Sequence, residues 1–420
     1  MKSIINDYKD FFTHIPRNIK LYLSILFFAT ILSAAYNILF GIYLKNSGFT
    51  EDIVGQILSL RTLGVAMGAV PVALFAQRFN KKRTLMIGLS IMVVSSFVLL
   101  NVQILIVMKI FSLIFGFGHA TAMILQGPII FENTKEAHRV MAFSMAFVFQ
   151  NLAFVFGSFV LGHLSQYLAG IYGSSQGNLL VLNGTTLMLP VGILIATFLS
   201  GPSMTTSKRD LPIVHDFIQV FKGYGGLLRG RTLKYLSQVA LVGLGAGMIV
   251  PFFSIYLKFT LDVSDGVVGN IMAISQVGTI IGGLIVPPLA KRIGTVKTII
   301  YCQLLSIPFL ISISLPQGLI VLTISFFFRS SLMNMASPLF RSIAMEITND
   351  DNRTHMSGMI SMTNNLFRAL GIFIGGYIMY EFTYNTPYYL TIICYLIGTF
   401  IIYSNFYKCD YKKVHEKVTA

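Results

Sequence analysis

The sequence predicts an all-α membrane protein with twelve transmembrane helices, arranged as two parallel repeats of six helices around a central cavity. Of its 420 residues, 55% are hydrophobic and 11% are charged, whereas about a quarter of the residues of a soluble domain are charged. Apolar segments of about 20 residues, the length that crosses ~30 Å of hydrocarbon, recur along the chain. The two halves of the chain also repeat each other, which predicts two bundles of the same topology.

The predicted spans fall into two sets of six. The first set covers residues 19–44, 52–76, 84–103, 104–131, 138–166 and 178–200. The second set covers residues 233–257, 265–290, 297–315, 318–345, 354–380 and 387–406. They predict an N-terminal bundle over 1–200, a polar linker over 201–232 and a C-terminal bundle over 233–420. The first apolar run lacks a small-residue cleavage site, so we expect it to stay as the first membrane helix.

The positive charge of the chain indicates its orientation in the membrane. The formal net charge is +15, and basic residues gather before the first span, after the second and fourth spans, in the linker and in the C-terminal tail. The opposite loops offer Lys45 and Lys258 beside several acids. By the positive-inside rule, both termini are cytoplasmic. We therefore expect a multi-pass protein of the cell membrane, whose partner is the lipid bilayer and not nucleic acid.

An internal repeat supports the two-bundle architecture. A displacement of 214 residues carries Val54 onto Val268 and aligns most of the two halves. The aligned pairs include Gly55 with Gly269, Arg78 with Arg292, Glu132 with Glu346, Arg139 with Arg353 and Gly162 with Gly376. A repeat of an even number of helices keeps its orientation in the membrane, so the halves are related by an axis along the membrane normal. Transporters have this architecture.

The loop after the second span carries a recognisable motif. It reads Ala76-Gln77-Arg78-Phe79-Asn80-Lys81-Lys82-Arg83, and Ala290-Lys291-Arg292-Ile293-Gly294 stands at the same place in the second half. Both resemble the major facilitator motif between helices two and three, in which a small residue and an acid precede Arg, Gly and a basic cluster. Here Gln77 replaces the acid and Asn80 the glycine. The chain is thus similar to twelve-helix bacterial transporters of the major facilitator superfamily.

The resemblance implies secondary transport by alternating access. Helices one, four, seven and ten would line the cavity, two, five, eight and eleven would flank it, and the others would face lipid. The family also carries an acid at the cytoplasmic end of helices four and ten, followed by Arg. The expected gating residues are therefore Arg78, Glu132, Arg139, Arg292, Glu346 and Arg353. The alternative is that these are solvated loop charges, since surface ion pairs contribute little.

Ionisable residues inside the spans are candidates for function, because each costs roughly 2.5 to 3.5 kcal/mol on insertion scales. Polar neighbours at helical spacing predict faces that line water or substrate. The candidate substrate-binding residues are Arg61, His119, Gln126, Arg329, Arg368, Asn365 and Asn37. His119 is also the candidate site of a coupling proton. The alternatives are polar contacts between packed helices and arginines that reach backbone carbonyls.

The sign of these charges favours an anionic substrate. Three arginines lie at mid-depth without an Asp or Glu, and arginine does not lose its proton. We therefore expect a monomeric exporter or exchanger of small organic anions. Efflux of amphipathic drugs or peptides is the second hypothesis, because 19 Met and 35 Phe could form an adaptable cavity. A lipid flippase that takes a phosphate headgroup is the third.

The sequence carries no sign of an enzyme. It contains no phosphate-cradling loop that ends in Gly-Lys-Ser/Thr, no His-Glu-x-x-His pair and no Gly-x-Ser-x-Gly turn. Cys302 and Cys394 lie in separate spans and Cys409 lies in the tail. We therefore expect no disulfide, metal site or cofactor.

Overall fold

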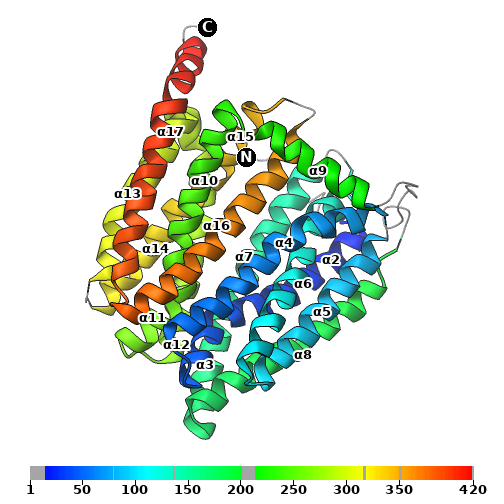
Figure 1. The fold of residues 1–420 in the computed structure, drawn as a ribbon, viewed down its shortest axis with the longest axis vertical. Helices are drawn as coiled ribbons and strands as arrows, with labels where there is room; N and C mark the ends of the chain where they lie inside the picture. Colours follow the sequence, from blue (N-terminus) through cyan, green and yellow to red (C-terminus); the bar gives the residue numbers. More distant parts are fainter. Residues whose placement is uncertain are drawn as a thin grey trace.

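The computed structural model describes residues 15–78, 80–135, 138–200, 213–315, 318–349 and 352–418, and helices make up almost all of them (Figure 1). The first span is divided into α2 (Arg17–Ala35), the π-helical turn η1 (Tyr36–Phe40) and α3 (Gly41–Asn46). The N-terminal half continues with α4 (Glu51–Arg78), α5 (Lys81–Asn101), α6 (Leu105–Glu132), α7 (Arg139–Tyr172) and α8 (Ser174–Thr197).

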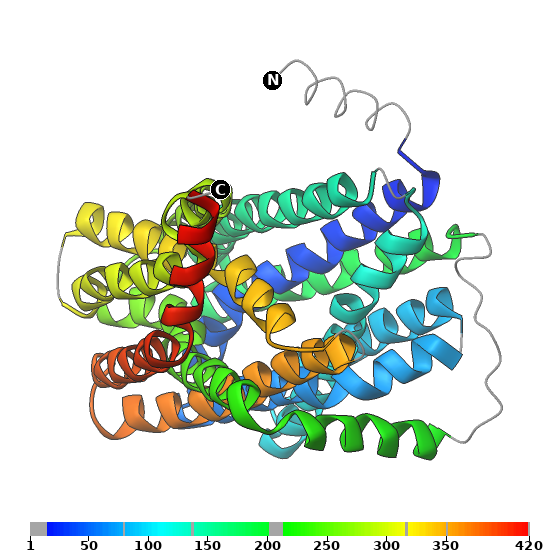
Figure 2. The ribbon, with the colours of Figure 1, turned by 90° about the horizontal axis from the view of Figure 1, so that it is seen from above.

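The C-terminal half repeats this order. Its first span comprises α10 (Gly230–Ile249), the 3₁₀ turn η4 (Val250–Phe252) and α11 (Phe253–Thr260). The others are α12 (Asp265–Ile293), α13 (Thr295–Ser314), α14 (Leu319–Met335) with α15 (Ser337–Glu346), α16 (Arg353–Glu381) and α17 (Thr386–Val418). Between the halves, α9 (Ile213–Leu227) packs across α4 and α16. Figure 2 shows α9 in green along the edge of the bundle.

Eleven helical segments of the described chain are long and apolar enough to cross a membrane. The twelfth predicted span corresponds to α16, which is long enough with 29 residues but is not among the eleven. The polar side chains of Asn364, Asn365 and Arg368 lower the hydropathy of its middle. These side chains face the cavity described below, so a span can be too polar by composition and still belong to the bundle.

The two halves meet along two symmetric seams, α4 against α16 and α7 against α12. A Cβ atom added at Gly55 would lie 2.9 Å from the Cα of Gly376, and one added at Gly162 would lie 2.9 Å from the Cα of Gly269. The four glycines are two pairs of the repeat, Gly55 with Gly269 and Gly162 with Gly376. Small residues at both seams allow the backbones of the two halves to touch.

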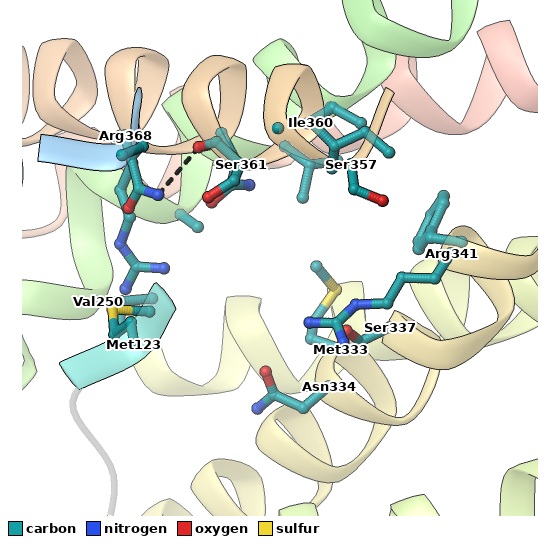
Figure 3. A pocket seen from close by; sticks show the side chains of 18 of the residues that line it. Met123, Val250, Met333, Asn334, Ser337, Arg341, Ser357, Ile360, Ser361 and Arg368 are labelled. Carbon is teal, nitrogen blue, oxygen red and sulfur yellow. Dashed lines mark hydrogen bonds between the residues drawn. The ribbon is translucent and has the colours of Figure 1, made fainter. Parts of the chain in front are cut away.

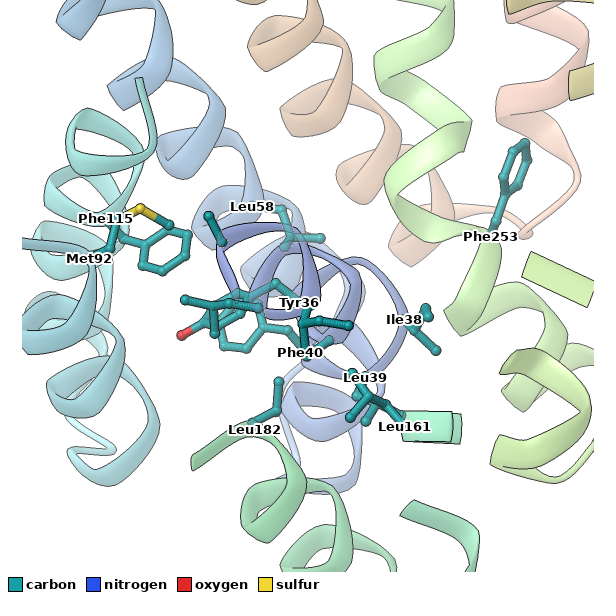
Figure 4. Close-up of a cluster of buried hydrophobic side chains, with 14 of the residues drawn as sticks. Tyr36, Ile38, Leu39, Phe40, Leu58, Met92, Phe115, Leu161, Leu182 and Phe253 are labelled. Atoms are coloured by element: carbon teal, nitrogen blue, oxygen red, sulfur yellow. The ribbon is translucent and has the colours of Figure 1, made fainter. Parts of the chain in front are cut away.

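The π-helical turn of the first span is held by an aromatic and polar cluster (Figure 4). The ring of Tyr36 stacks on Phe115 of α6 at a centroid distance of 4.6 Å. The Tyr36 hydroxyl hydrogen-bonds Ser96 Oγ of α5 at 2.6 Å, which satisfies the phenol inside the apolar bundle. Within the turn, the carbonyl oxygen of Asn37 accepts a hydrogen bond from Ser254 Oγ of the other half at 3.3 Å.

Candidate functional site

A cavity of about 1670 Å³ lies between the two halves (Figure 3). One end of the bundle carries α9, α15 and the end of α17, and we call it the α9 end; α3 and α11 lie at the opposite end, the α3 end (Figure 1). The cavity runs from Asn37 and Val250 at mid-bundle to Lys222, Arg341 and Ser357. The last three residues are exposed, so the cavity is open at the α9 end.

The charge of the cavity wall has one sign. The basic side chains of Lys222, Arg329, Arg341 and Arg368 line it, and none of the described lining residues is Asp or Glu. Three of the four come from α14, α15 and α16 of the C-terminal half. Positive side chains without acids in a partly enclosed space create a potential that attracts anions.

Arg329 is the most buried of these arginines, with 5% of its surface exposed. Its Nη2 donates to Tyr395 Oη at 3.3 Å, and its guanidinium carbon lies 4.9 Å from the centroid of the Phe253 ring. Its Nε has no hydrogen-bond partner. The charge is therefore held by a phenol and an aromatic face, which stabilise a cation but do not neutralise it.

Arg368 lies on the wall opposite Arg341, on α16 (Figure 3). Its neighbour Asn365 donates to the carbonyl oxygen of Ser361 at 2.9 Å, the bond dashed in Figure 3. A Cβ atom added at Gly247 of α10 would lie 2.3 Å from the carbonyl oxygen of Arg368. Glycine at position 247 therefore allows α16 to pack on α10 closely enough to place Arg368 at mid-bundle.

The predicted substrate-binding residues divide between the cavity wall and the N-terminal half. Asn37, Arg329, Asn365 and Arg368 line the cavity together. The others are not among the described lining residues, namely Arg61, His119 and Gln126. The guanidinium of Arg61 lies 5.6 Å from the Tyr36 ring centroid, His119 Nε2 lies 3.5 Å from Ser33 Oγ, and Gln126 and Gln150 exchange hydrogen bonds of 3.3 and 3.2 Å.

Two lining residues come from helices expected to face lipid. Gln303 on α13 and Tyr395 on α17 both reach the cavity. Gln238 also lines the cavity, but it comes from α10, which belongs to a span expected to line it. Each of the two glutamines is a single amide within an apolar span, and that isolation is the signal that sequence reasoning overlooked. At the α9 end, Tyr224 also lines the cavity, and burial raises the pKa of its phenol.

The predicted gating residues lie at the α9 end. Glu132 accepts from Lys81 Nζ of its own half at 2.5 Å, and the guanidinium of Arg139 lies 3.6 Å from the Phe131 ring centroid. Arg353 Nε donates to the Met345 carbonyl oxygen at 3.3 Å. The remaining predicted residues lie at the C-terminal ends of three helices: Arg78 ends α4, Arg292 lies in the last turn of α12 and Glu346 ends α15. The side chain of Arg78 lies outside the described part of the chain.

The sequence matches the Major Facilitator Superfamily over residues 22–221 and 236–419. The chain belongs to this superfamily. Comparison with curated proteins finds no match. Each of the two matched segments covers most of one helical half. The transporter is therefore a multi-pass membrane protein of the major facilitator type, as the sequence predicted.

Solved structures of transporters share the fold of this superfamily member. The nucleoside transporter NupG superposes with a TM-score of 0.79 at 16% identity, over 92% of this chain and 100% of the other. A bacterial homolog of the lysosomal transporter Spinster gives 0.71 at 14% identity, over 92% and 96%. A proton dependent oligopeptide transporter gives 0.69 at 12% identity, over 92% and 98%. These similarities establish the fold.

Two acids that the repeat aligns, Glu51 and Asp265, join the two halves of the transporter at the α3 end. Glu51 accepts from Lys45 of its own half at 2.5 Å and from the hydroxyl of Tyr384 in the other half. Asp265, which is 2% exposed, forms an ion pair with Lys258 of its own half at 3.0 Å. Each acid therefore joins a lysine of its own half to polar groups of the other.

The Asp265 contacts across the seam are more numerous. Its Oδ2 accepts from Ser165 Oγ at 2.9 Å and from Asn178 Nδ2 at 2.8 Å. Oδ1 faces the Lys258 ammonium without hydrogen-bond geometry. A cavity open at one end and closed by such contacts at the other is one of the two states that alternating access requires.

Proposed function

We propose that the chain is a secondary transporter that moves a small organic anion across the cell membrane by alternating access, as an exporter or an exchanger. The observation that carries this proposal is the charge of the cavity, where Arg329, Arg341 and Arg368 meet no Asp or Glu among the described lining residues. Arginine stays charged at all physiological pH values. An anionic substrate supplies the counterion that the protein does not.

The orientation of the bundle supports export or exchange. The α9 end carries Lys222, Arg229, Arg231 and Lys234, so the positive-inside rule places it, with both termini, in the cytoplasm. The cavity is then open to the cytoplasm and can load its substrate there. Arg78, Glu132, Arg139, Arg292, Glu346 and Arg353 stand at this end, where the halves would approach when it closes, and we assign gating to them.

Transport of amphipathic drugs or peptides is the second candidate. The cavity wall includes the flexible side chains Met123, Met272, Met333 and Met345 and the aromatic side chains Phe154, Phe253 and Phe340. Methionine adapts to ligands of different shape. A cavity that selects by apolar contact would bind neutral or cationic amphipaths as tightly as anions, which separates the two candidates.

The experiment is thermal stabilisation of the purified protein by anionic, neutral and cationic solutes, because a ligand that binds the folded state raises its stability. We expect anions to stabilise the wild type and the exposed control Arg229→Gln, and to lose their effect in Arg329→Gln and Arg368→Gln. Equal stabilisation by neutral or cationic amphipaths in all four proteins would instead support the second candidate.

A further inference from the structure

One wall of the cavity holds buried polar groups whose hydrogen bonds are incomplete. Gln238 and Gln303 are each 1% exposed and Arg329 is 5% exposed. Among the described residues, both polar atoms of the Gln238 side chain, Gln303 Nε2 and Arg329 Nε have no partner. A buried amide or guanidinium left unpaired costs about 1 to 3 kcal/mol, so a wall with four such atoms is not explained by folding.

These side chains converge on one segment of α17, residues 395–399. Arg329 donates to Tyr395 Oη, and Thr399 Oγ1 donates to Gln303 Oε1 at 2.9 Å. A Cβ atom added at Gly398 would lie 3.7 Å from Gln238 Cγ. All of the polar residues except Thr399 line the cavity. We call Gln238, Gln303, Arg329 and Tyr395 the α17 subsite.

The unpaired atoms of the α17 subsite have almost no exposed surface, so a ligand pairs with them when the side chains turn toward the cavity that the four residues line. Their donors and acceptors then define the ligand. Arg329 Nε and Gln303 Nε2 are donors, which suit the oxygens of a carboxylate. Gln238 offers a donor and an acceptor side by side in one plane. That pair is complementary to a carbonyl oxygen and an N–H on the same edge of a ligand, as in a primary amide or a lactam.

We propose that the transported anion carries such a cis amide edge, which pairs with Gln238 while Arg329 and Gln303 bind its carboxylate. This inference rests on the proposed transport of anions and names the substrate class within it. A trans amide of an ordinary peptide bond presents its carbonyl and N–H on opposite sides and cannot pair with both atoms of one glutamine. The α17 subsite therefore selects lactams, cyclic imides and primary amides over linear peptides.

The test uses three anions built on the same five-membered ring: 5-oxoproline, the isosteric lactone 5-oxotetrahydrofuran-2-carboxylate, and N-methyl-5-oxoproline, which carries an extra methyl group. They differ in whether the ring offers an N–H to Gln238 Oε1. We expect the lactam to bind the wild type about tenfold more tightly than the lactone, because the lactone leaves that buried oxygen unpaired. Binding is measured by thermal stabilisation and by competition for uptake into proteoliposomes.

Two variants locate the discrimination. Gln238→Met keeps the volume and removes both polar atoms, so lactam and lactone should bind it equally. Gln103→Met makes the same change at an exposed loop position and should keep the tenfold preference. The unliganded unfolding midpoint and the gel-filtration profile of each variant report whether it is folded, and the wild-type comparison stands without any variant.

The outcomes separate this inference from the proposed function. Equal binding of lactam and lactone by the wild type overturns the α17 subsite and leaves anion transport standing, as does a preference that survives in Gln238→Met. Failure of all three anions to bind also overturns the inference, because the α17 subsite requires the lactam anion to bind. The solute panel then tests anion transport independently. If neutral 5-oxoprolinamide binds as tightly as 5-oxoproline, anion transport is overturned. The comparison of lactam with lactone still tests whether Gln238 pairs with the amide edge.

Discussion

Arg329 shows how a single residue can serve binding at the expense of stability. Its side chain is buried against Phe253 and Tyr395, and no acid lines the described cavity wall beside it. Burial of a charge without a counterion opposes folding, while the same charge gives an entering anion a strong partner. The contributions of Arg329 to the free energy of unfolding and to binding should therefore have opposite signs.

The variant Arg329→Met tests this opposition. We expect its unliganded free energy of unfolding to rise by about 1 to 3 kcal/mol, because an uncompensated buried charge is replaced by an apolar chain of similar length. Anion affinity should fall by at least about tenfold, since a charge-assisted hydrogen bond is lost. Unfolding midpoints with and without anion measure both effects. A destabilised variant that still binds anions would contradict the assignment.

At the scale of the helices, the seams explain how the two halves can close one end of the cavity. The backbones of α4 and α16 touch at Gly55 and Gly376, and those of α7 and α12 touch at Gly162 and Gly269. Glu51 and Asp265 begin the helices α4 and α12 at the same end. Close glycine contacts and buried polar contacts therefore stabilise the same closed arrangement.

A side chain at Gly55 should open the α3 end. A Cβ atom there meets backbone atoms of Gly376 and Ile372 at 2.9 and 3.1 Å, which cannot move without separating α4 from α16. We expect Gly55→Val to increase the labelling of an introduced Asn37→Cys by an impermeant maleimide applied from the α3 side, in a background without the native cysteines. Gly170→Val is the control, because nothing lies within 4 Å of that position. Unchanged labelling in both would contradict the role of the seam.

Loss of the Asp265 carboxylate should act in the same direction. Asp265→Asn removes the charge that faces Lys258 and weakens the contacts with Ser165 and Asn178. Lys258 is partly exposed, so loss of this pair costs less than the about 3 to 5 kcal/mol of a fully buried pair. The cost falls on the closed state, in which the pair forms. We expect Asp265→Asn to raise the Asn37→Cys labelling rate, and Tyr384→Phe to raise it less, because Glu51 keeps Lys45. The reverse order would place the main contact at Glu51.

At the scale of the whole molecule, orientation decides to which side of the membrane the cavity opens in this state. The described end of α17 lies at the α9 end, together with the opening of the cavity (Figure 1). The basic residues Lys222 of α9, Arg229, and Arg231 and Lys234 of α10 are on the same side. By the positive-inside rule, we expect the cavity to face the cytoplasm in this state.

Reporter fusions at the C-terminus test this orientation. A green fluorescent protein fused after Ala420 should fluoresce, because it folds in the cytoplasm. An alkaline phosphatase fused there should be inactive, because it folds only outside the cytoplasm. Fusions placed in the loop that contains Gly173 are the control with the opposite expectation. An active phosphatase at the C-terminus would reverse the orientation, so that the cavity of this state opens to the outside of the cell.

The sequence by itself determined the class of the protein. Hydropathy reports the lipid solvent, so it predicted the helical spans, and the 214-residue register predicted which glycines of the two halves correspond. It also found Arg329 and Arg368, because charges are rare in apolar spans. The helical spacing of Asn364, Asn365 and Arg368 also predicted that this face of α16 lines water or substrate, and these residues line the cavity.

Only the tertiary structure decided which polar residues share the cavity. The rotation of each helix about its axis, set by contacts such as Gly247 with the Arg368 carbonyl, turns Arg368 into the cavity, whereas Arg61 packs near Tyr36. Gln303 reached the wall from a helix expected to face lipid, and Glu132 paired with Lys81. Spacing along one helix cannot specify these partners, because they depend on how neighbouring helices pack.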